Sequence, residues 1–127
     1  MNRKNYVEAF GQSPVFVSAV FIGGGDSADL TVAATTTVPG SGNAAYTGAR
    51  TGEGVYECVF REGSVPQNVL QIIPHCEGAG HRPEITTSWD ATTRKVVVTT
   101  RNSSGTADDL PTTDRLCLLL IGQDTSA

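Results

Sequence analysis

Two histidines and a cysteine lie close together in the middle of the chain. His75 and Cys76 are adjacent, and His81 follows a few residues later. Imidazole nitrogens and thiolate sulfurs are the ligands that zinc prefers. However, neighbouring residues in an extended segment point to opposite faces, and no Cys-x-x-Cys or His-x-x-x-His spacing is present. We therefore expect no metal and no cofactor, with His75, Cys76 and His81 as the candidates should a metal bind.

The cysteines point to free thiols rather than to a disulfide framework. Cys58, Cys76 and Cys117 make an odd number without a short motif spacing, whereas a secreted disulfide framework favours an even number. We expect all three to be unpaired and to pack as small hydrophobic side chains in a reducing compartment.

One glycine motif has the spacing of a dinucleotide-binding fingerprint. Gly23-x-Gly25-x-x-Ala28 follows an apolar run. The fingerprint requires a helix after the glycines, because the pyrophosphate binds at the helix N-terminus. Residues 29–38 are instead rich in threonine and valine and end before a proline, which predicts a strand. We therefore expect a glycine turn between antiparallel strands.

Patterns for nucleophilic or acid–base catalysis are weak. The sequence has no Gly-x-Ser-x-Gly elbow, and its carboxylates are scattered. The adjacent pair Asp108 and Asp109 lies in a loop of small polar residues, where we expect both to be solvated. We predict that the protein is not an enzyme.

Length and charge narrow the class of protein further. The chain has 127 residues, enough for one domain, with 17% charged residues and a net charge of −4. This charge and the absence of a basic cluster argue against a nucleic-acid partner. The apolar run at residues 15–22 is too short to span a bilayer, so we expect no membrane contact.

Short apolar and β-branched runs recur along the chain with turn residues between them. This pattern is typical of an all-β sandwich or barrel. We predict a single antiparallel domain over residues 14–127, preceded by an N-terminal arm at residues 1–13. The expected strands lie at residues 15–22, 29–38, about 45–47, 54–61, 68–75, 85–90, 95–101 and 115–121.

Alternation within these runs predicts which side chains face the core. Tyr56, Cys58 and Phe60 should share the buried face of one strand. The residues Ile85, Thr87 and Trp89 should share a face of another.

Residues 115–121 form an almost continuous apolar run. Such a run is typical of a central strand that is buried on both sides. We expect the domain core to cover one side and a neighbouring subunit the other.

A long stretch near the N-terminus is almost free of charge. Residues 9–49 contain only two charged side chains, Asp26 and Asp29. A typical chain carries about 25% charged residues, so this stretch suggests surface that another protein covers. Residues 15–38 are explained by core strands, which leaves residues 39–49 and the arm as the parts that most need a partner.

The second half of the chain resembles small virion proteins of tailed bacteriophages. A strand that begins Gly52-x-Gly54-Val55-Tyr56 leads through a second strand to a hairpin strand at residues 95–102. A loop rich in Gly, Ala, Asp and Pro at 105–111 then precedes a terminal strand at 114–121. Over residues 47–122 this order is similar to that of head decoration, or cement, proteins. The resemblance implies a β-sandwich or barrel, usually trimeric, that sits on the outer capsid lattice and has no catalytic residues.

We therefore expect a decoration protein that binds the major capsid protein as a homotrimer and stabilises the shell. It would assemble in the bacterial cytoplasm and reside on the capsid exterior. Tyr6, Phe10 and Tyr46 are the predicted capsid or subunit contacts, with Tyr6 and Phe10 anchoring an arm that pairs with a capsid strand. The alternatives are a tail, baseplate or fibre module that binds a virion protein or a host glycan, and a small metal-dependent enzyme centred on His75, Cys76 and His81.

Overall fold

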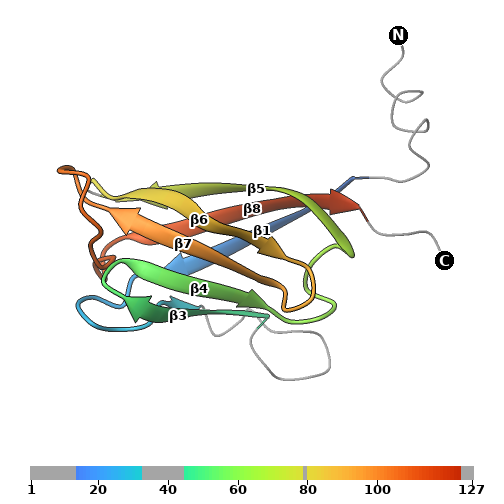
Figure 1. Cartoon of the computed structure of the whole chain (residues 1–127), viewed down its shortest axis with the longest axis horizontal. Helices are drawn as coiled ribbons and strands as arrows, with labels where there is room; N and C mark the ends of the chain where they lie inside the picture. Colours follow the sequence, from blue (N-terminus) through green and yellow to red (C-terminus); the bar gives the residue numbers. More distant parts are fainter. Residues whose placement is uncertain (1–13, 33–44, 79, 124–127) are drawn as a thin grey trace, which may run out of the picture.

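The structure, a computed structural model, describes residues 14–32, 45–78 and 80–123. Within them eight strands form two four-stranded antiparallel sheets packed as a sandwich (Figure 1). The predicted all-β antiparallel architecture is confirmed. The predicted arm at residues 1–13 lies outside the described residues. The parts of the chain that are described contain no helix, and thus none long and apolar enough to cross a membrane.

The two sheets are named here sheet I and sheet II. Sheet I has the strand order β2 (Thr31–Val32), β1 (Pro14–Ile22), β8 (Arg115–Gln123) and β5 (Asn68–Glu77). Sheet II has the order β3 (Tyr46–Gly52), β4 (Val55–Phe60), β7 (Lys95–Arg101) and β6 (Arg82–Asp90). β8 therefore lies in the interior of sheet I, and β5 and β6 are edge strands.

Two expected elements differ in extent from the observed ones. The short strand expected at residues 45–47 is instead the seven-residue β3, because a tight turn at Gly54, where φ is +70°, pairs the whole segment with β4. Of the strand expected at residues 29–38, the described part contributes only β2, while Leu30 bridges to Gly48 on β3. Residues 33–38 lie outside the described residues.

The predicted face of β6 is wrong at one position. Ile85 and Trp89 are half-buried and pack against the core, but Thr87 is exposed. The register with β7 shifts on both sides of Thr87, so simple alternation fails there.

The core between the sheets contains the residues that alternation predicted on β4. Tyr56, Cys58 and Phe60 are fully buried. Phe21 and Tyr46 pack against one another with ring centroids 4.8 Å apart, and Phe60 lies 5.6 Å from Tyr46 and 5.7 Å from Trp89. These aromatic contacts join the inner surfaces of both sheets.

The placement of Tyr46 corrects its expected role as a contact residue. Its side chain is buried, with only 6% of the residue exposed. Its hydroxyl accepts a hydrogen bond from the Val20 backbone N–H at 3.0 Å and donates to the Val20 carbonyl at 3.3 Å. Tyr46 thus ties sheet II to β1 and is not available to a partner.

The three cysteines are unpaired, as predicted. Cys58 is fully buried in the core, and burial raises the pKa of its thiol to about 12. Cys76 and Cys117 are half-buried.

Candidate functional site

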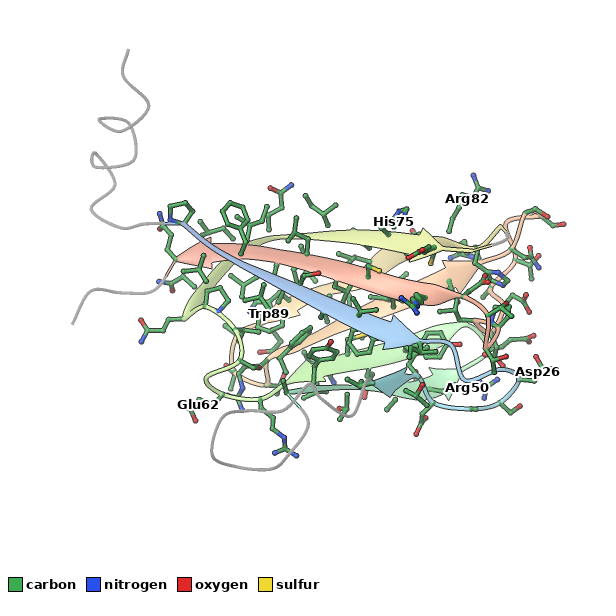
Figure 2. All side chains as sticks on the ribbon, turned by 180° about the vertical axis from the view of Figure 1, so that it is seen from behind. Asp26, Arg50, Glu62, His75, Arg82 and Trp89 are labelled. Carbon is green, nitrogen blue, oxygen red and sulfur yellow. The ribbon has the colours of Figure 1, made fainter. Side chains whose placement is uncertain are left out.

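The residues predicted as metal candidates are not brought together. His75 is exposed on the outer side of β5, opposite Cys117, whereas Cys76 is half-buried and pairs with the inward-facing Leu116. In Figure 2, His75 projects from the outer side of the sandwich and Trp89 lies between the two sheets. Within residues 14–32, 45–78 and 80–123, no group of three or more His, Cys, Asp or Glu is placed to hold a metal ion.

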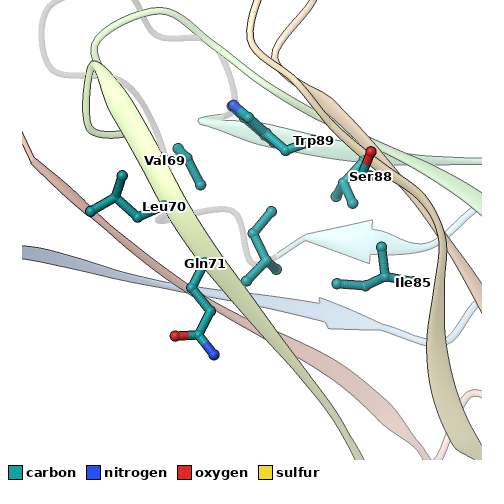
Figure 3. A pocket seen from close by; sticks show the side chains of 8 residues that line it. Val69, Leu70, Gln71, Ile85, Ser88 and Trp89 are labelled. Atoms are coloured by element: carbon teal, nitrogen blue, oxygen red, sulfur yellow. The ribbon is translucent and has the colours of Figure 1, made fainter.

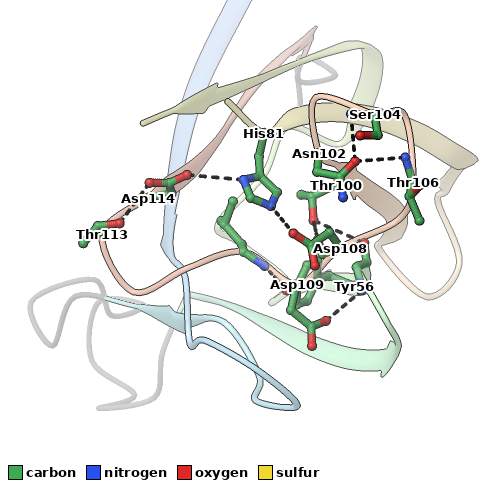
Figure 4. Close-up of polar contacts among 12 residues, drawn as sticks. Tyr56, His81, Thr100, Asn102, Ser104, Thr106, Asp108, Asp109, Thr113 and Asp114 are labelled. Atoms are coloured by element: carbon green, nitrogen blue, oxygen red, sulfur yellow. Dashed lines mark hydrogen bonds and ion pairs between the residues drawn. The ribbon is translucent and has the colours of Figure 1, made fainter. Parts of the chain in front are cut away.

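His81 instead belongs to a polar cluster at one end of the sandwich (Figure 4). Its Nε2 lies 2.9 Å from an Asp108 carboxylate oxygen, and its Nδ1 lies 3.6 Å from Asp114. The turn between β5 and β6 can approach Asp114 closely because Gly78, at φ +138°, has no Cβ in the way. These contacts fasten that turn to the loop between β7 and β8.

Asp109 is the most tightly held carboxylate of this loop. It accepts hydrogen bonds from Arg50 Nε at 2.9 Å, from the Gly54 N–H at 2.8 Å and from the Ser27 N–H at 2.8 Å. Burial alone would raise the pKa of Asp109, but these hydrogen bonds and the charge of Arg50 outweigh burial and lower the pKa to about 2. The expectation that Asp108 and Asp109 are both solvated is wrong, since Asp109 is only 7% exposed.

The outer side of sheet I carries a group of apolar side chains. Strand alternation and register place the odd-numbered residues of β8, the even-numbered residues of β1 and, beyond the register shift after Val69, residues 71, 73, 75 and 77 of β5 on this side. We call this surface the apolar face, and its apolar members are Phe16, Val20, Ile22, Ile73, Cys117, Leu119 and Ile121.

Cross-strand pairs make the apolar face continuous. Phe16 pairs with Ile121 across β1 and β8, and Ile73 pairs with Leu119 across β8 and β5. Phe16 is 62% exposed and Ile73 is 44% exposed, although both are large apolar side chains. Glu77 and Arg115 are the charged side chains on this side and lie opposite each other at one end, and the uncharged polar members are Ser18, Asn68, Gln71, His75 and Gln123. A contiguous apolar patch of this kind marks a surface that contacts another molecule.

The outer side of sheet II is different in chemistry, and we call it the charged face. Lys95 Nζ lies 3.2 Å from Glu57, and Arg101 Nε lies 2.8 Å from Glu84. These ion pairs cross from β7 to both of its neighbours, and Val55, Val59 and Val97 lie on the same side.

Part of the apolar face was visible in the sequence. The run at residues 115–121 predicts a strand with two apolar sides, and the inner residues Leu116, Leu118 and Leu120 are indeed fully buried. The contribution of Phe16, Val20 and Ile22 was missed, because residues 15–22 were explained by the core alone. The signal was the lack of alternation in that run, where both sides of the strand are apolar.

Comparisons of the chain with protein families, with curated proteins and with solved structures found no match.

Proposed function

We propose that the protein is a structural component of a tailed-phage virion that decorates the outer surface of the capsid. The apolar face is the surface that would contact the major capsid protein and be buried on assembly. The observation that carries this proposal is the pairing of large exposed apolar side chains, Phe16 and Ile73, with the outer residues of the interior strand β8.

The shape of the site suits a protein partner. A face built from three paired strands is broad, and broad surfaces bury the area that a specific protein contact needs, about 800 Å² on each side. Small ligands usually bind in concave pockets instead. Removing apolar surface from water contributes roughly 25 cal/mol for each Å², so covering this face would supply much of the binding free energy.

The nearly uncharged stretch at residues 9–49 fits the same proposal. Its described part includes β1, whose inward residues Ala19 and Phe21 are fully buried in the core. The outward residues Phe16, Val20 and Ile22 belong to the apolar face. If a capsid protein covers the outer side of β1, both sides of this strand are removed from water, which accounts for its apolar residues on both sides.

The proposal is tested by placing one charge on each outer face. Leu119→Lys introduces a cation in the middle of the apolar face, and Val97→Lys introduces the same cation on the charged face, at a half-buried position of β7. The full chain and both variants would be mixed with undecorated phage heads, sedimented and imaged. We expect the full chain and Val97→Lys to bind, and Leu119→Lys to bind at least about tenfold more weakly, because burying an unpaired charge is costly.

Cys117 provides an independent readout of the same contact. Its thiol is half-buried on the apolar face, opposite His75, whereas Cys58 is fully buried in the core. In the free chain we expect alkylation at Cys117 and protection of Cys58, and on decorated heads we expect Cys117 to become protected. Absence of binding by the full chain, or equal binding by both lysine variants with Cys117 still reactive, would refute the proposal.

A further inference from the structure

A second apolar feature lies at the open edge between the two sheets. An open pocket of about 270 Å³ lies between the edge strands β5 and β6. In Figure 3, Ile85, Ser88 and Trp89 on β6 lie across the space from Val69 on β5. Besides these residues, the lining includes Leu70, Gln71, Ile72 and Val96, and Leu70 is 65% exposed.

The backbone around this pocket is irregular and lacks proline. The register of β5 shifts between Val69 and Gln71, and that of β6 shifts on both sides of Thr87. The prolines of these edges, Pro74 and Pro83, lie farther along, toward the turn that joins the two strands. Proline and other blocking devices protect edge strands from pairing with other chains. Bulges hinder backbone pairing as proline does, so the pocket end is suited to receiving apolar side chains rather than an added strand.

We propose that the N-terminal arm of a neighbouring copy inserts into this pocket. Residues 1–13 contain Tyr6, Val7 and Phe10 as large apolar side chains. A dry apolar cavity of about 150 Å³ accommodates a benzene ring, so a pocket of about 270 Å³ has room for one aromatic side chain and part of its neighbour.

The arm begins at the same end of the sandwich as the pocket. Pro14, the first residue of β1, pairs with Gln123, and Gln123 pairs with Asn68 at the start of β5. Two strand spacings of about 4.8 Å therefore separate the start of β1 from the edge that carries the pocket. An extended arm of 13 residues reaches roughly 40 Å, which is ample for contact between adjacent copies.

Direction favours a neighbouring copy over the same chain. β1 begins at Pro14 at this end of the sandwich and runs from there toward the opposite end. The pocket lies back along β5, at Val69 to Ile72, so the arm of the same chain would have to reverse direction within a few residues. The arm of another copy needs no such reversal. An exchange of this kind is head-to-tail and can close into a ring, as in a trimer.

The single tryptophan of the chain makes the exchange directly measurable. Trp89 lines the pocket, and no other residue contributes indole fluorescence. An acceptor chain would carry Tyr6→Ala and Phe10→Ala, which remove the arm side chains but leave Trp89 in place. A donor chain would carry Trp89→Phe, which keeps the arm side chains but contributes no tryptophan fluorescence.

Titrating donor into acceptor should shift the Trp89 emission to shorter wavelength and reduce its quenching by acrylamide. The matched control is a Trp89→Phe chain that also carries Tyr6→Ala and Phe10→Ala, and it should cause neither change. In the unmodified chain, the same shift should appear as concentration rises, together with a larger mass in light scattering.

Equal effects of donor and control, or no effect of either, would overturn the inference. A third outcome would also overturn it. If the Trp89 emission of the unmodified chain differs from that of the acceptor and does not change on dilution, the arm docks within its own chain. The experiment contains no capsid, so its outcome is independent of the capsid contact proposed for the apolar face.

Discussion

The outer faces of the two sheets differ although their inner faces are alike. Inside, Val96 and Val98 of sheet II and Leu118 and Leu120 of sheet I are all fully buried. Outside, sheet II carries cross-strand ion pairs such as that between Arg101 and Glu84, while sheet I carries the apolar face. The fold therefore does not require the outer residues of sheet I to be apolar, and their character points to a contact outside the domain.

β8 offers the strongest test of this difference, because its residues alternate between the buried core and the outer apolar face. Leu118→Ala removes a fully buried side chain and should lower the free energy of unfolding by about 2–5 kcal/mol. Leu119→Ala, on the half-buried outer side, should cost less than about 1 kcal/mol in dilute solution. Urea denaturation measures both values. Equal losses would show that the apolar face is already covered in the free chain.

A second prediction concerns Asp109 in the loop between β7 and β8, which lies on neither outer face. Asp109→Asn replaces the carboxylate that holds Arg50 and the N–H groups of Gly54 and Ser27, and should cost about 1–3 kcal/mol. Asp109 lies on neither outer face. When Leu119→Lys and Val97→Lys are each combined with Asp109→Asn, the ratio of their affinities for phage heads should therefore stay the same. A change in that ratio would mean that this loop takes part in binding.

Acid titration sharpens this prediction. The pKa of Asp109 in the folded protein is about 2, below the value of about 3.9 in an unfolded chain. The stability that its ionised form contributes is therefore complete above about pH 5 and is lost as the pH falls toward 2. Chemical denaturation across this interval should show a smaller decrease for Asp109→Asn than for the unmodified chain.

The smallest effect is expected on the charged face. Glu84→Ala removes the partner of Arg101 from an exposed pair and should change the free energy of unfolding by at most about 1 kcal/mol. Added salt should shrink the difference, because salt screens exposed charges. Binding to phage heads should not change. Reduced binding would place the charged face in the contact and weaken the contrast between the two sheets.

The strands were more predictable from the sequence than the contacts between them. β4 and β8 follow from local patterns of apolar residues, which the hydrophobic effect imposes on any strand with a buried side. Thr87 was misplaced because a register shift depends on the partner strand and leaves little trace in the local pattern.

Long-range polar contacts were the hardest to predict. The burial of Asp109 depends on Arg50, Gly54 and Ser27, which are 59, 55 and 82 residues away in sequence. The burial of Tyr46 was missed for a similar reason. Its hydroxyl bonds to the backbone of Val20, and a backbone partner leaves no trace in the types of residue along the sequence.

The pairing of Pro14 with Gln123 has a practical consequence for engineering. Because the start of β1 and the end of β8 lie side by side, a short linker could join them, and the chain could be reopened at the exposed turn near Ser104. Such a circular permutant would move both chain ends to the opposite end of the sandwich. Cargo fused there would be displayed away from the end at which β1 begins.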